Sequence, residues 1–373
     1  MPKTVLHIVE AAGGVERYLV TLLSKMKKYQ EFEHILVCST TYDKKKFNGL
    51  VKKIVVLNDM HNAISLFKDV KSILITRRLI QEYNPDIVYC HSSKAGAIGR
   101  IANIGIRNKL IYNAHGWSFN IRNLNPVRTQ LYNTIERMLA PMCDLIVCIS
   151  EYEKKSALEH RLCDEKKLVV INNGIDFDEY KDIKPKSRSE LGIPCDAFVV
   201  GTIGRLTTQK APDIFVKMAI EIKKIIPNAF FLMVGDDIGD GKIRYETEKN
   251  IKESGLGDSF HITGWVDDPL NYVGVFDVAT LLSRWEGFGL VLPEYMLMEK
   301  PIVATRSDAI PYVVGDAGVL VDVDDYIQAA ESVARLHFDK KLRELIIEKE
   351  RNRVVFFDAE VTAENHIVQF LQL

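Results

Sequence analysis

Short apolar runs alternate with longer segments of helical periodicity from one end of the chain to the other. In the first half, six apolar runs predict strands, at residues 5–9, 34–38, 54–57, 87–90, 110–113 and 145–149. The second half repeats the pattern at residues 199–203, 230–234, 260–262, 278–282, 302–305 and 319–321. Strands that alternate with helices are typical of parallel sheets covered by helices. We therefore predict an α/β protein built from two Rossmann-like domains.

A polar segment that contains prolines, residues 176–194, separates the two sets of strands and predicts a linker. We expect a first domain over residues 1–180 and a second over 181–352. The last segment, 353–373, has a helical pattern and is expected to pack back on the first domain. Because α/β proteins bind ligands at the carboxyl ends of strands and between domains, a ligand is expected in a cleft between the two sheets.

Length and composition agree with this organisation. The chain has 373 residues, 47% hydrophobic and 27% charged, which suits two to three soluble domains. Residues 1–180 carry a net charge of +7 and the remainder −8, so an anionic partner is expected on the first domain; chance remains the alternative. Six cysteines without metal-ligand spacing indicate reduced thiols of a cytosolic protein. No signal peptide or membrane-spanning run is apparent, so any membrane contact is expected to be peripheral.

Two carboxylates bracket a glycine-bearing segment, Glu286 to Glu294. The first follows the apolar run 278–282 on an expected loop, and the second lies within an expected helix. If the whole segment were helical, the two would stand about 12 Å apart. Carboxylates accept hydrogen bonds from the vicinal hydroxyls of a sugar or a ribose, so the pair suits a nucleotide-linked sugar. The alternative is two solvated glutamates near a helix start.

Two cations, Arg205 and Lys210, follow the first strand of the second domain. At a strand's carboxyl end they could clamp a diphosphate and stabilise the charge on a departing nucleoside diphosphate. Ordinary surface cations are the alternative.

The first domain carries further candidates at the ends of its strands. Gly13 and Gly14 precede a helix expected over residues 17–28, and they would permit close approach of a phosphate. His91 and His115 could hydrogen-bond a sugar hydroxyl, although a structural role is the alternative for each. Two Asp-x-Asp sequences, at 176–178 and 322–324, are interpreted as a linker and a helix cap rather than metal sites.

In this order the segments resemble the retaining GT-B glycosyltransferases of family 4, also called glycosyl transferases group 1. That family includes many enzymes of capsule, exopolysaccharide and lipopolysaccharide assembly, and the resemblance spans nearly the whole chain. The matching segments are Gly13-Gly14-Val15-Glu16-Arg17, His91-Ser92-Ser93-Lys94-Ala95-Gly96, Asn113-Ala114-His115-Gly116, Ile149-Ser150, Asn173-Gly174-Ile175-Asp176, Gly204-Arg205 with Lys210, Gly264-Trp265-Val266, and Glu286 with Glu294.

The resemblance implies a GT-B fold, with two Rossmann-like domains facing across a cleft, and a role for each matching residue. Arg205 and Lys210 would bind the donor diphosphate, Glu294 the ribose and the backbone near Trp265 and Val266 the base. Three groups of residues follow: catalytic, His115, Glu286, Arg205 and Lys210; donor-binding, Gly14, Arg205, Lys210, Trp265, Val266, Gly287, Phe288, Gly289, Leu290 and Glu294; acceptor-binding, Arg17, His91 and Lys94.

The resemblance also implies a reaction that keeps the anomeric configuration, in which the leaving phosphate helps to deprotonate the acceptor. No metal and no cofactor other than the nucleotide sugar is expected, and no nucleic acid. The expected donor is a UDP-sugar, with guanosine and adenosine as the other bases. The expected acceptor is a lipid-linked glycan at the cytoplasmic face of a membrane, near the basic residues Lys44 to Lys46, Lys52, Lys53, Arg77 and Arg78.

The chain departs from the family pattern at three places beside the expected donor site: Glu299, Asp308-Ala309 and Tyr312. These departures leave the choice of sugar open. Two other functions would fit the same fold: an epimerase or phosphorylase that opens an anomeric bond, and a scaffold that binds a sugar nucleotide without turnover.

Overall fold

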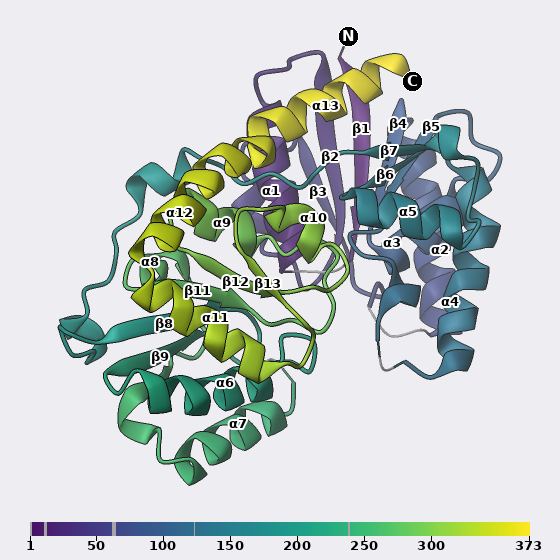
Figure 1. Ribbon diagram of the computed structural model, residues 1–373. Coiled ribbons are helices and arrows are strands. Elements are labelled where there is room, and N and C mark those ends of the chain that lie inside the picture. The colour runs from purple at the N-terminus through teal and green to yellow at the C-terminus, as the bar shows by residue number, and fades with distance from the viewer. Residues whose placement is uncertain (1, 11–12, 62–64, 123, 238) are drawn as a thin grey trace. The chain divides into compact units, whose positions relative to one another are not determined.

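A computed structural model describes residues 2–10, 13–61, 65–122, 124–237 and 239–373 (Figure 1). The chain forms two compact units. Unit 1 comprises Met1–Asp176 and Phe357–Leu373, and unit 2 comprises Phe177–Phe356. Each unit has its own parallel sheet.

The sheet of unit 1 has seven strands in the order β3-β2-β1-β4-β5-β6-β7. Every strand pair is parallel, and the order reverses beside β1, as in doubly wound folds. The strands are β1 (Lys3–Val9), β2 (Phe32–Ser39), β3 (Lys53–Leu57), β4 (Ile87–His91), β5 (Lys109–Asn113), β6 (Leu145–Cys148) and β7 (Leu168–Val170).

Helices cover both faces of this sheet. Leu6 and Ile8 of β1 pack in a cluster with residues of α2 (Leu66–Tyr83), α3 (Ser93–Ala102) and α5 (Glu151–Glu159). Val5 and Val9 point to the opposite face, where α1 (Gly14–Met26) and α13 (Ala359–Gln372) lie together. A further helix, α4 (Pro126–Leu139), contacts α3. Alternate side chains of one strand therefore supply two cores, which explains why these strands are apolar throughout.

The sheet of unit 2 has six parallel strands in the order β10-β9-β8-β11-β12-β13. They are β8 (Phe198–Ile203), β9 (Ala229–Val234), β10 (Phe260–Ile262), β11 (Val278–Leu281), β12 (Ile302–Thr305) and β13 (Val319–Val321). The helices are α6 (Pro212–Ile225), α7 (Lys242–Glu253), α8 (Leu270–Val273), α9 (Val291–Leu297), α10 (Ile310–Val314), α11 (Tyr326–Phe338) and α12 (Lys340–Val354). In one core of this unit, residues of α6 and α11 pack against β8 and β9.

The predicted α/β class and all twelve predicted strands are confirmed. Strand β7 was not predicted, because its three residues follow a charged segment and form a short strand at the edge of the sheet. The helix expected over residues 17–28 begins earlier, at Gly14, after Gly13 with φ 83°. The segment from 353 holds the end of α12 and then α13, whose N-cap Asp358 accepts from the backbone N–H of Glu360.

The chain leaves and re-enters unit 1 at one place. The backbone N–H of Ile175 donates to the carbonyl of Phe357 at 2.8 Å, and that of Ala359 donates to the carbonyl of Ile175 at 3.0 Å. A Cβ on Gly174 would lie 2.5 Å from the Cα of Ala359, so this approach requires glycine. The unit boundaries therefore lie after residues 176 and 356, a few residues from the predicted positions 180 and 352.

All six cysteines are free, and four of them are buried. Among the described residues, no helix is both long and apolar enough to cross a membrane.

Candidate functional site

The end of β8 in unit 2 holds the two predicted phosphate-binding cations. Gly204 and Arg205 follow this strand directly, and the N–H of Gly204 donates to the carbonyl of Val234 at 3.0 Å. Gly235, with φ 141°, lies so close that a Cβ on it would stand 2.1 Å from the carbonyl oxygen of Gly204. Only glycine fits there, so the backbone after β8 and the backbone after β9 are held against each other.

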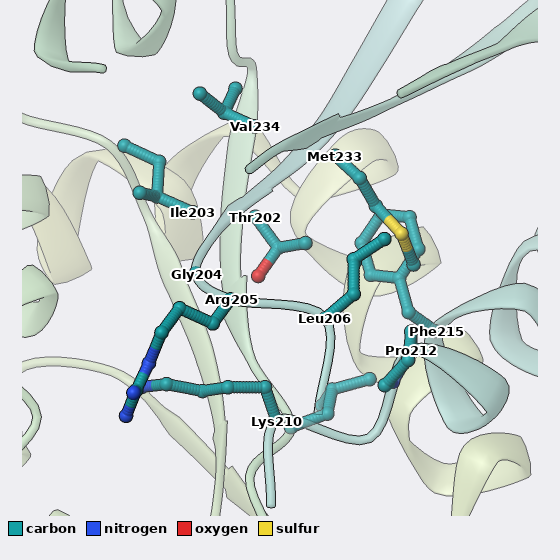
Figure 2. A pocket seen from close by; sticks show the side chains of 11 residues that line it. Thr202, Ile203, Gly204, Arg205, Leu206, Lys210, Pro212, Phe215, Met233 and Val234 are labelled. Atoms are coloured by element: carbon teal, nitrogen blue, oxygen red, sulfur yellow. The ribbon is translucent and has the colours of Figure 1, made fainter. Parts of the chain in front are cut away.

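The side chains of Arg205 and Lys210 extend in the same direction from this loop (Figure 2). The aliphatic stem of Lys210 crosses Gly204, where an added Cβ would lie 3.3 Å from Lys210 Cδ. Arg205 is exposed, and no side chain in the described part of unit 2 pairs with its guanidinium. An arginine without a carboxylate partner is available for bidentate hydrogen bonding to an anion.

Beside these cations lies a small cavity of about 20 Å³. It has room for little more than a water molecule, so a phosphate-sized anion would bind outside it, against the cations. Its lining residues are Thr202, Ile203, Gly204, Arg205, Leu206, Lys210, Pro212, Phe215, Met233, Val234 and Leu282 (Figure 2).

Glu286 is brought to the same place by the loop after β11. Its carboxylate forms an ion pair with Lys210 and also accepts from Ser283 Oγ at 2.9 Å. Its backbone N–H donates to Asp308 Oδ2 at 3.1 Å, and its carbonyl accepts from the N–H of Ala309 at 3.3 Å. Hydrogen bonds therefore hold the Glu286 loop to the loop after β12, and the ion pair holds it to Lys210.

Glu294 lies one turn inside α9, as predicted, and is 1% exposed. The segment between the two glutamates is not helical throughout: α9 begins only at Val291, and Gly289 has φ 81°. Next to Glu294, the hydroxyl of Tyr295 accepts from the backbone N–H of Ile203 at 2.8 Å. This bond ties α9 to the end of β8, so Glu294 is held in a fixed position relative to Arg205.

Within the same loop, Phe288 and Gly289 are buried, whereas Gly287 and Leu290 are partly exposed. Sequence reasoning missed Ser283, Asp308 and Tyr295 as residues that hold this loop and α9. Asp308 alone carried a signal, as a departure from the family pattern.

Trp265 and Val266 follow β10. Gly264 pairs with Gly235 in an isolated bridge, so this turn adjoins the Gly204 loop. Trp265 is 65% exposed and Val266 is partly buried.

In unit 1, His115 has the left-handed φ of 52°, and its backbone N–H donates to Asn113 Oδ1 at 3.0 Å. The ring of Tyr18 meets the His115 ring edge-on at 4.6 Å. Burial lowers the pKa of His115 to about 3, so the imidazole is neutral at physiological pH.

The remaining candidates of unit 1 have different surroundings. His91 is fully buried, and its two ring nitrogens lie 3.1 Å from His7 and from His115. It therefore stands behind His115 and is not at a surface where an acceptor could contact it. Lys94 forms an ion pair with Asp69 at 2.6 Å. Gly14 is the exposed first residue of α1, and Arg17 lies on that helix, partly buried.

The aspartates of the two Asp-x-Asp sequences form ion pairs with lysine and arginine side chains. Asp176 pairs with Lys25 and Asp178 with Lys181. Asp322 and Asp324 pair with Arg306 and Arg284. The residue that caps α11 is Asp325, whose side chain accepts from the N–H of Gln328.

Two of the departures from the family pattern face α12. Glu299 has the left-handed φ of 56° and binds Arg351 with both carboxylate oxygens, each at 2.7 Å. The carbonyl of Tyr312 accepts from Arg353. Asp308 and Ala309 both hydrogen-bond to Glu286, so this pair is the departure that can affect the site.

Two family models match consecutive parts of the chain. The model described as Glycosyltransferase Family 4 matches residues 12–179, and the model described as Glycosyl transferases group 1 matches residues 183–353.

Relatives of known name match much of the chain. A UDP-Gal:alpha-D-GlcNAc-diphosphoundecaprenol alpha-1,3-galactosyltransferase of Escherichia coli is 30% identical over 305 residues, which cover 78% of this chain and 76% of the relative. The capsular polysaccharide biosynthesis glycosyltransferase CapM of Staphylococcus aureus is 27% identical, over 86% of this chain and 84% of the relative.

Solved structures share the fold. Anabaena HepE in complex with UDP and glucose aligns with a TM-score of 0.82 at 19% identity, over all of both chains. WaaG, a glycosyltransferase involved in lipopolysaccharide biosynthesis, aligns with a TM-score of 0.75 at 14% identity, over 97% of this chain and 98% of WaaG.

Proposed function

Because the chain belongs to family 4 of the GT-B glycosyltransferases, we propose that it transfers a hexose from a UDP-sugar to a lipid-linked glycan during assembly of a cell-surface polysaccharide. The names of the relatives support this choice. The Escherichia coli relative uses UDP-Gal and a diphosphoundecaprenol acceptor, and the Staphylococcus aureus relative takes part in capsule biosynthesis. UDP-galactose is therefore the first donor to test.

One observation carries the proposal: Arg205, whose guanidinium pairs with no side chain in the described part of unit 2, stands with Lys210 in the loop after β8. Two cations at a strand end suit a diphosphate and the negative charge that grows on it as it leaves. Glu294, held beside this strand through Tyr295, would accept hydrogen bonds from the ribose hydroxyls. The exposed Trp265 would lie near the base.

In the proposed reaction the bond between C1 of the sugar and the phosphate oxygen breaks, and a bond from C1 to the acceptor oxygen forms on the same face. The proton of the acceptor hydroxyl passes to the departing phosphate oxygen. The protein positions the two substrates and stabilises charge. Glu286 is engaged by Lys210, Ser283 and the Asp308 loop, so we assign it to holding the sugar rather than to attack on C1. We propose that neither metal nor further cofactor takes part.

The test is release of UDP from UDP-galactose in the presence of an undecaprenyl-diphosphate-linked N-acetylhexosamine. Arg205→Ala is expected to lower kcat/KM roughly 100-fold, the usual cost of one charge-stabilising donor. Arg306→Ala, which removes an exposed arginine after β12, is the matched control and should retain activity. Activity should survive EDTA, and proton NMR of the product should show the donor's anomeric configuration.

Full activity of Arg205→Ala would contradict the site. Turnover of the donor without any acceptor would favour the epimerase, and tight UDP binding without turnover on any acceptor would favour the scaffold.

A lipid-linked acceptor requires contact with a membrane, and α2 offers a surface for it. The inner face of this helix is buried in unit 1, whereas four apolar side chains point outward. Leu66 and Phe67 are 84% and 83% exposed, and Val70 and Leu74 lie on the same side. We name these four residues, with the exposed cations Lys68 and Arg78, the α2 surface; the neighbouring Lys71 pairs with Asp59 at 2.7 Å. Apolar side chains beside cations suit an anionic bilayer.

Several cations expected at a membrane have other partners. Lys46 pairs with Glu16 and Lys52 with Glu33, while Arg77 donates to the carbonyls of Ala102 and Ile104. The α2 surface is therefore the part of unit 1 that we assign to membrane contact, at the cytoplasmic face.

A further inference from the structure

Four histidines form a continuous row across the sheet of unit 1. Neighbouring ring nitrogens are 3.0 Å apart between His34 and His7, 3.1 Å between His7 and His91, and 3.1 Å between His91 and His115. His7 and His91 are fully buried, His34 nearly so, and His115 is partly exposed. The row thus runs from the interior to a partly exposed end.

Strand register produces the row. Val5 of β1 lies opposite His34 of β2, and His7 is the next side chain on that face. His7 in turn lies opposite Tyr89 of β4, and His91 is the next side chain along that strand. From one strand to the next, the histidine lies two residues after the residue that pairs with the preceding histidine. Both then point to the same face of the sheet, because side chains on one face repeat every second residue.

All three links have the same direction. The Nδ1 of His34 meets the Nε2 of His7, the Nδ1 of His7 meets the Nε2 of His91, and the Nδ1 of His91 meets the Nε2 of His115. A neutral imidazole has one N–H and one acceptor nitrogen, so every link needs one of each. The hydrogen-bond chain is therefore complete only if all four rings carry their proton on Nδ1, or all four on Nε2.

The four rings are neutral near pH 7. Burial lowers the pKa of His34 to about 4 and that of His115 to about 3, and it lowers the pKa of His7 and His91 well below the usual value. The titratable groups packed around the row are Tyr18 of α1, Tyr89 of β4 and His366 of α13.

These neighbours do not interrupt the row. The Nδ1 of His366 lies 2.8 Å from the carbonyl of Thr362, which can only accept, so His366 carries its proton there. Its Nε2 is then the acceptor nitrogen, and it lies 3.0 Å from the hydroxyl of Tyr89 and 3.1 Å from that of Tyr18. In the described part of unit 1, no carboxylate bonds to a ring of the row.

The surroundings of His34 Nε2 decide which of the two proton arrangements is favoured. His34 Nε2 is buried, and no described group lies within hydrogen-bonding distance of it. In the Nε2–H arrangement this atom would be a buried donor without an acceptor, the rarest kind of unpaired polar group in proteins. In the Nδ1–H arrangement it is a bare acceptor nitrogen, and every N–H inside the row is bonded. The Nδ1–H arrangement is therefore favoured.

We propose that His34, His7 and His91 are positioning residues that fix His115 in the Nδ1–H tautomer, so that His115 presents a hydrogen-bond donor to an oxygen atom of its ligand. The ligand rests on the proposed function and on the expectation from the sequence that His115 hydrogen-bonds the sugar, so the oxygen would be that of a sugar hydroxyl. The tautomer itself does not depend on that function.

The ring ¹⁵N spectrum of the ligand-free protein tests the tautomer. Histidine is labelled with ¹⁵N, and the His115 signals are assigned by their loss in His115→Gln. We expect Nδ1 of His115 at the shift of a protonated nitrogen and Nε2 at that of an acceptor nitrogen, unchanged between pH 6 and 8. A proton on Nε2, or a mixture of tautomers, would overturn the proposal without any variant.

Variants at the two ends of the row test the coupling, one at His34 and two at His91. By the same rule, His34→Leu leaves the buried Nε2 of His7 as the bare end, so His115 should keep its proton on Nδ1. His91→Leu instead removes the donor to His115 Nε2, and we expect a tautomer mixture at His115 and a roughly fivefold to tenfold lower kcat, with KM for the nucleotide sugar unchanged. His91→Asn, whose amide can donate an N–H to His115, should restore both. An unaltered His115 spectrum in a folded His91→Leu would overturn the proposal.

Separate experiments test the tautomer of His115 and the proposed glycosyl transfer, so failure of one can be told from failure of the other. The spectra decide whether the row sets the tautomer of His115, whatever the reaction. Arg205→Ala decides the glycosyl transfer. Full transfer activity of His115→Gln would remove His115 from contact with the sugar and would overturn the part of the inference that names its ligand.

Discussion

Two ionisable residues, Arg100 and Glu350, are fully buried, and they differ in whether they keep their charge. Arg100 donates to Glu136 at 2.8 Å and lies 3.9 Å above the ring of Tyr112, so its charge is kept and paired. Glu350 of α12 has no such cationic partner among the described residues. Burial raises the pKa of Glu350 to about 10, so its carboxyl group stays protonated in the folded protein at neutral pH.

Glu350→Gln is expected to stabilise unit 2 in a pH-dependent manner. The unfolded chain releases this proton above about pH 4.5, whereas the folded chain keeps it until about pH 10. The contribution of Glu350 to stability is therefore complete below pH 4.5 and is lost progressively as the pH rises toward 10. A neutral glutamine lacks this penalty. Thermal melts should show the variant about 1–3 kcal/mol more stable at pH 8 and nearly equal to wild type at pH 4.5.

Glu348→Gln, an exposed position on the same helix, is the control and should change little at either pH. Equal gains at both pH values would contradict the neutral state of Glu350.

At the scale of elements, α13 is the last helix of the chain yet completes the core of unit 1. Phe370 is fully buried and meets the ring of Phe32 of β2 at 5.5 Å. Thr362 Oγ1 donates to the carbonyl of Asn172 at 3.0 Å. The apolar side chains of α1 on this face of the sheet therefore share their core with a helix more than 300 residues away in sequence.

Phe370→Ala should lower the stability of unit 1 by about 3–5 kcal/mol, because a buried aromatic ring is lost and a cavity remains. The matched control is Leu371→Ala, one residue along α13, where the side chain is 60% exposed and a change within about 0.5 kcal/mol is expected. Calorimetry would measure both. A loss of similar size in the two variants would mean that α13 is held by its backbone and not by this ring.

The loop that carries Glu286 is held by the loop after β12 through Asp308. Asp308→Ala removes the acceptor for the Glu286 N–H and should lower kcat/KM for the sugar donor roughly 5- to 30-fold, which corresponds to about 1–2 kcal/mol. Asp308→Asn keeps an acceptor oxygen and should retain most activity. Affinity for UDP alone, measured by calorimetry, should change little, because Arg205 and Lys210 are untouched; a large loss would assign Asp308 to the diphosphate instead.

At the scale of the whole molecule, the charge is uneven: residues 1–180 carry +7 and the remainder −8. The α2 surface, with Leu66 and Phe67 outward, belongs to the basic part. Attraction of cations and burial of apolar side chains act together at an anionic bilayer, and neither term alone gives firm binding.

Replacing Leu66 and Phe67 together by serine should reduce sedimentation with vesicles of anionic phospholipid at least tenfold, since each side chain buried in the interface contributes about 1.5–3 kcal/mol. Tyr245→Ser is the control, because Tyr245 is 69% exposed on α7 of unit 2. Wild-type protein should bind neutral vesicles weakly and lose binding to anionic ones at high salt. Undiminished binding of the double variant would place the membrane contact elsewhere.

Most strands could be predicted, and candidate site residues could be proposed beside them, because these signals are local. An apolar run of five residues indicates a strand wherever it lies, and Arg205, Lys210 and the two glutamates follow such runs at short distances. The same rule failed for β7, because three residues carry too little pattern. The start of α1 was placed too late, since a glycine pair gives no helical signal.

The sequence by itself determined the α/β class, the twofold repetition of parallel sheets and the family, all of which depend on order along the chain. Tertiary structure alone decided that His34 and His7 stand in line behind His115, that Asp308 holds Glu286, and that Tyr295 reaches Ile203. These contacts join residues 22 to 92 positions apart. They depend on strand order and register, which no local periodicity contains, because each strand's pattern is the same whichever neighbour it pairs with.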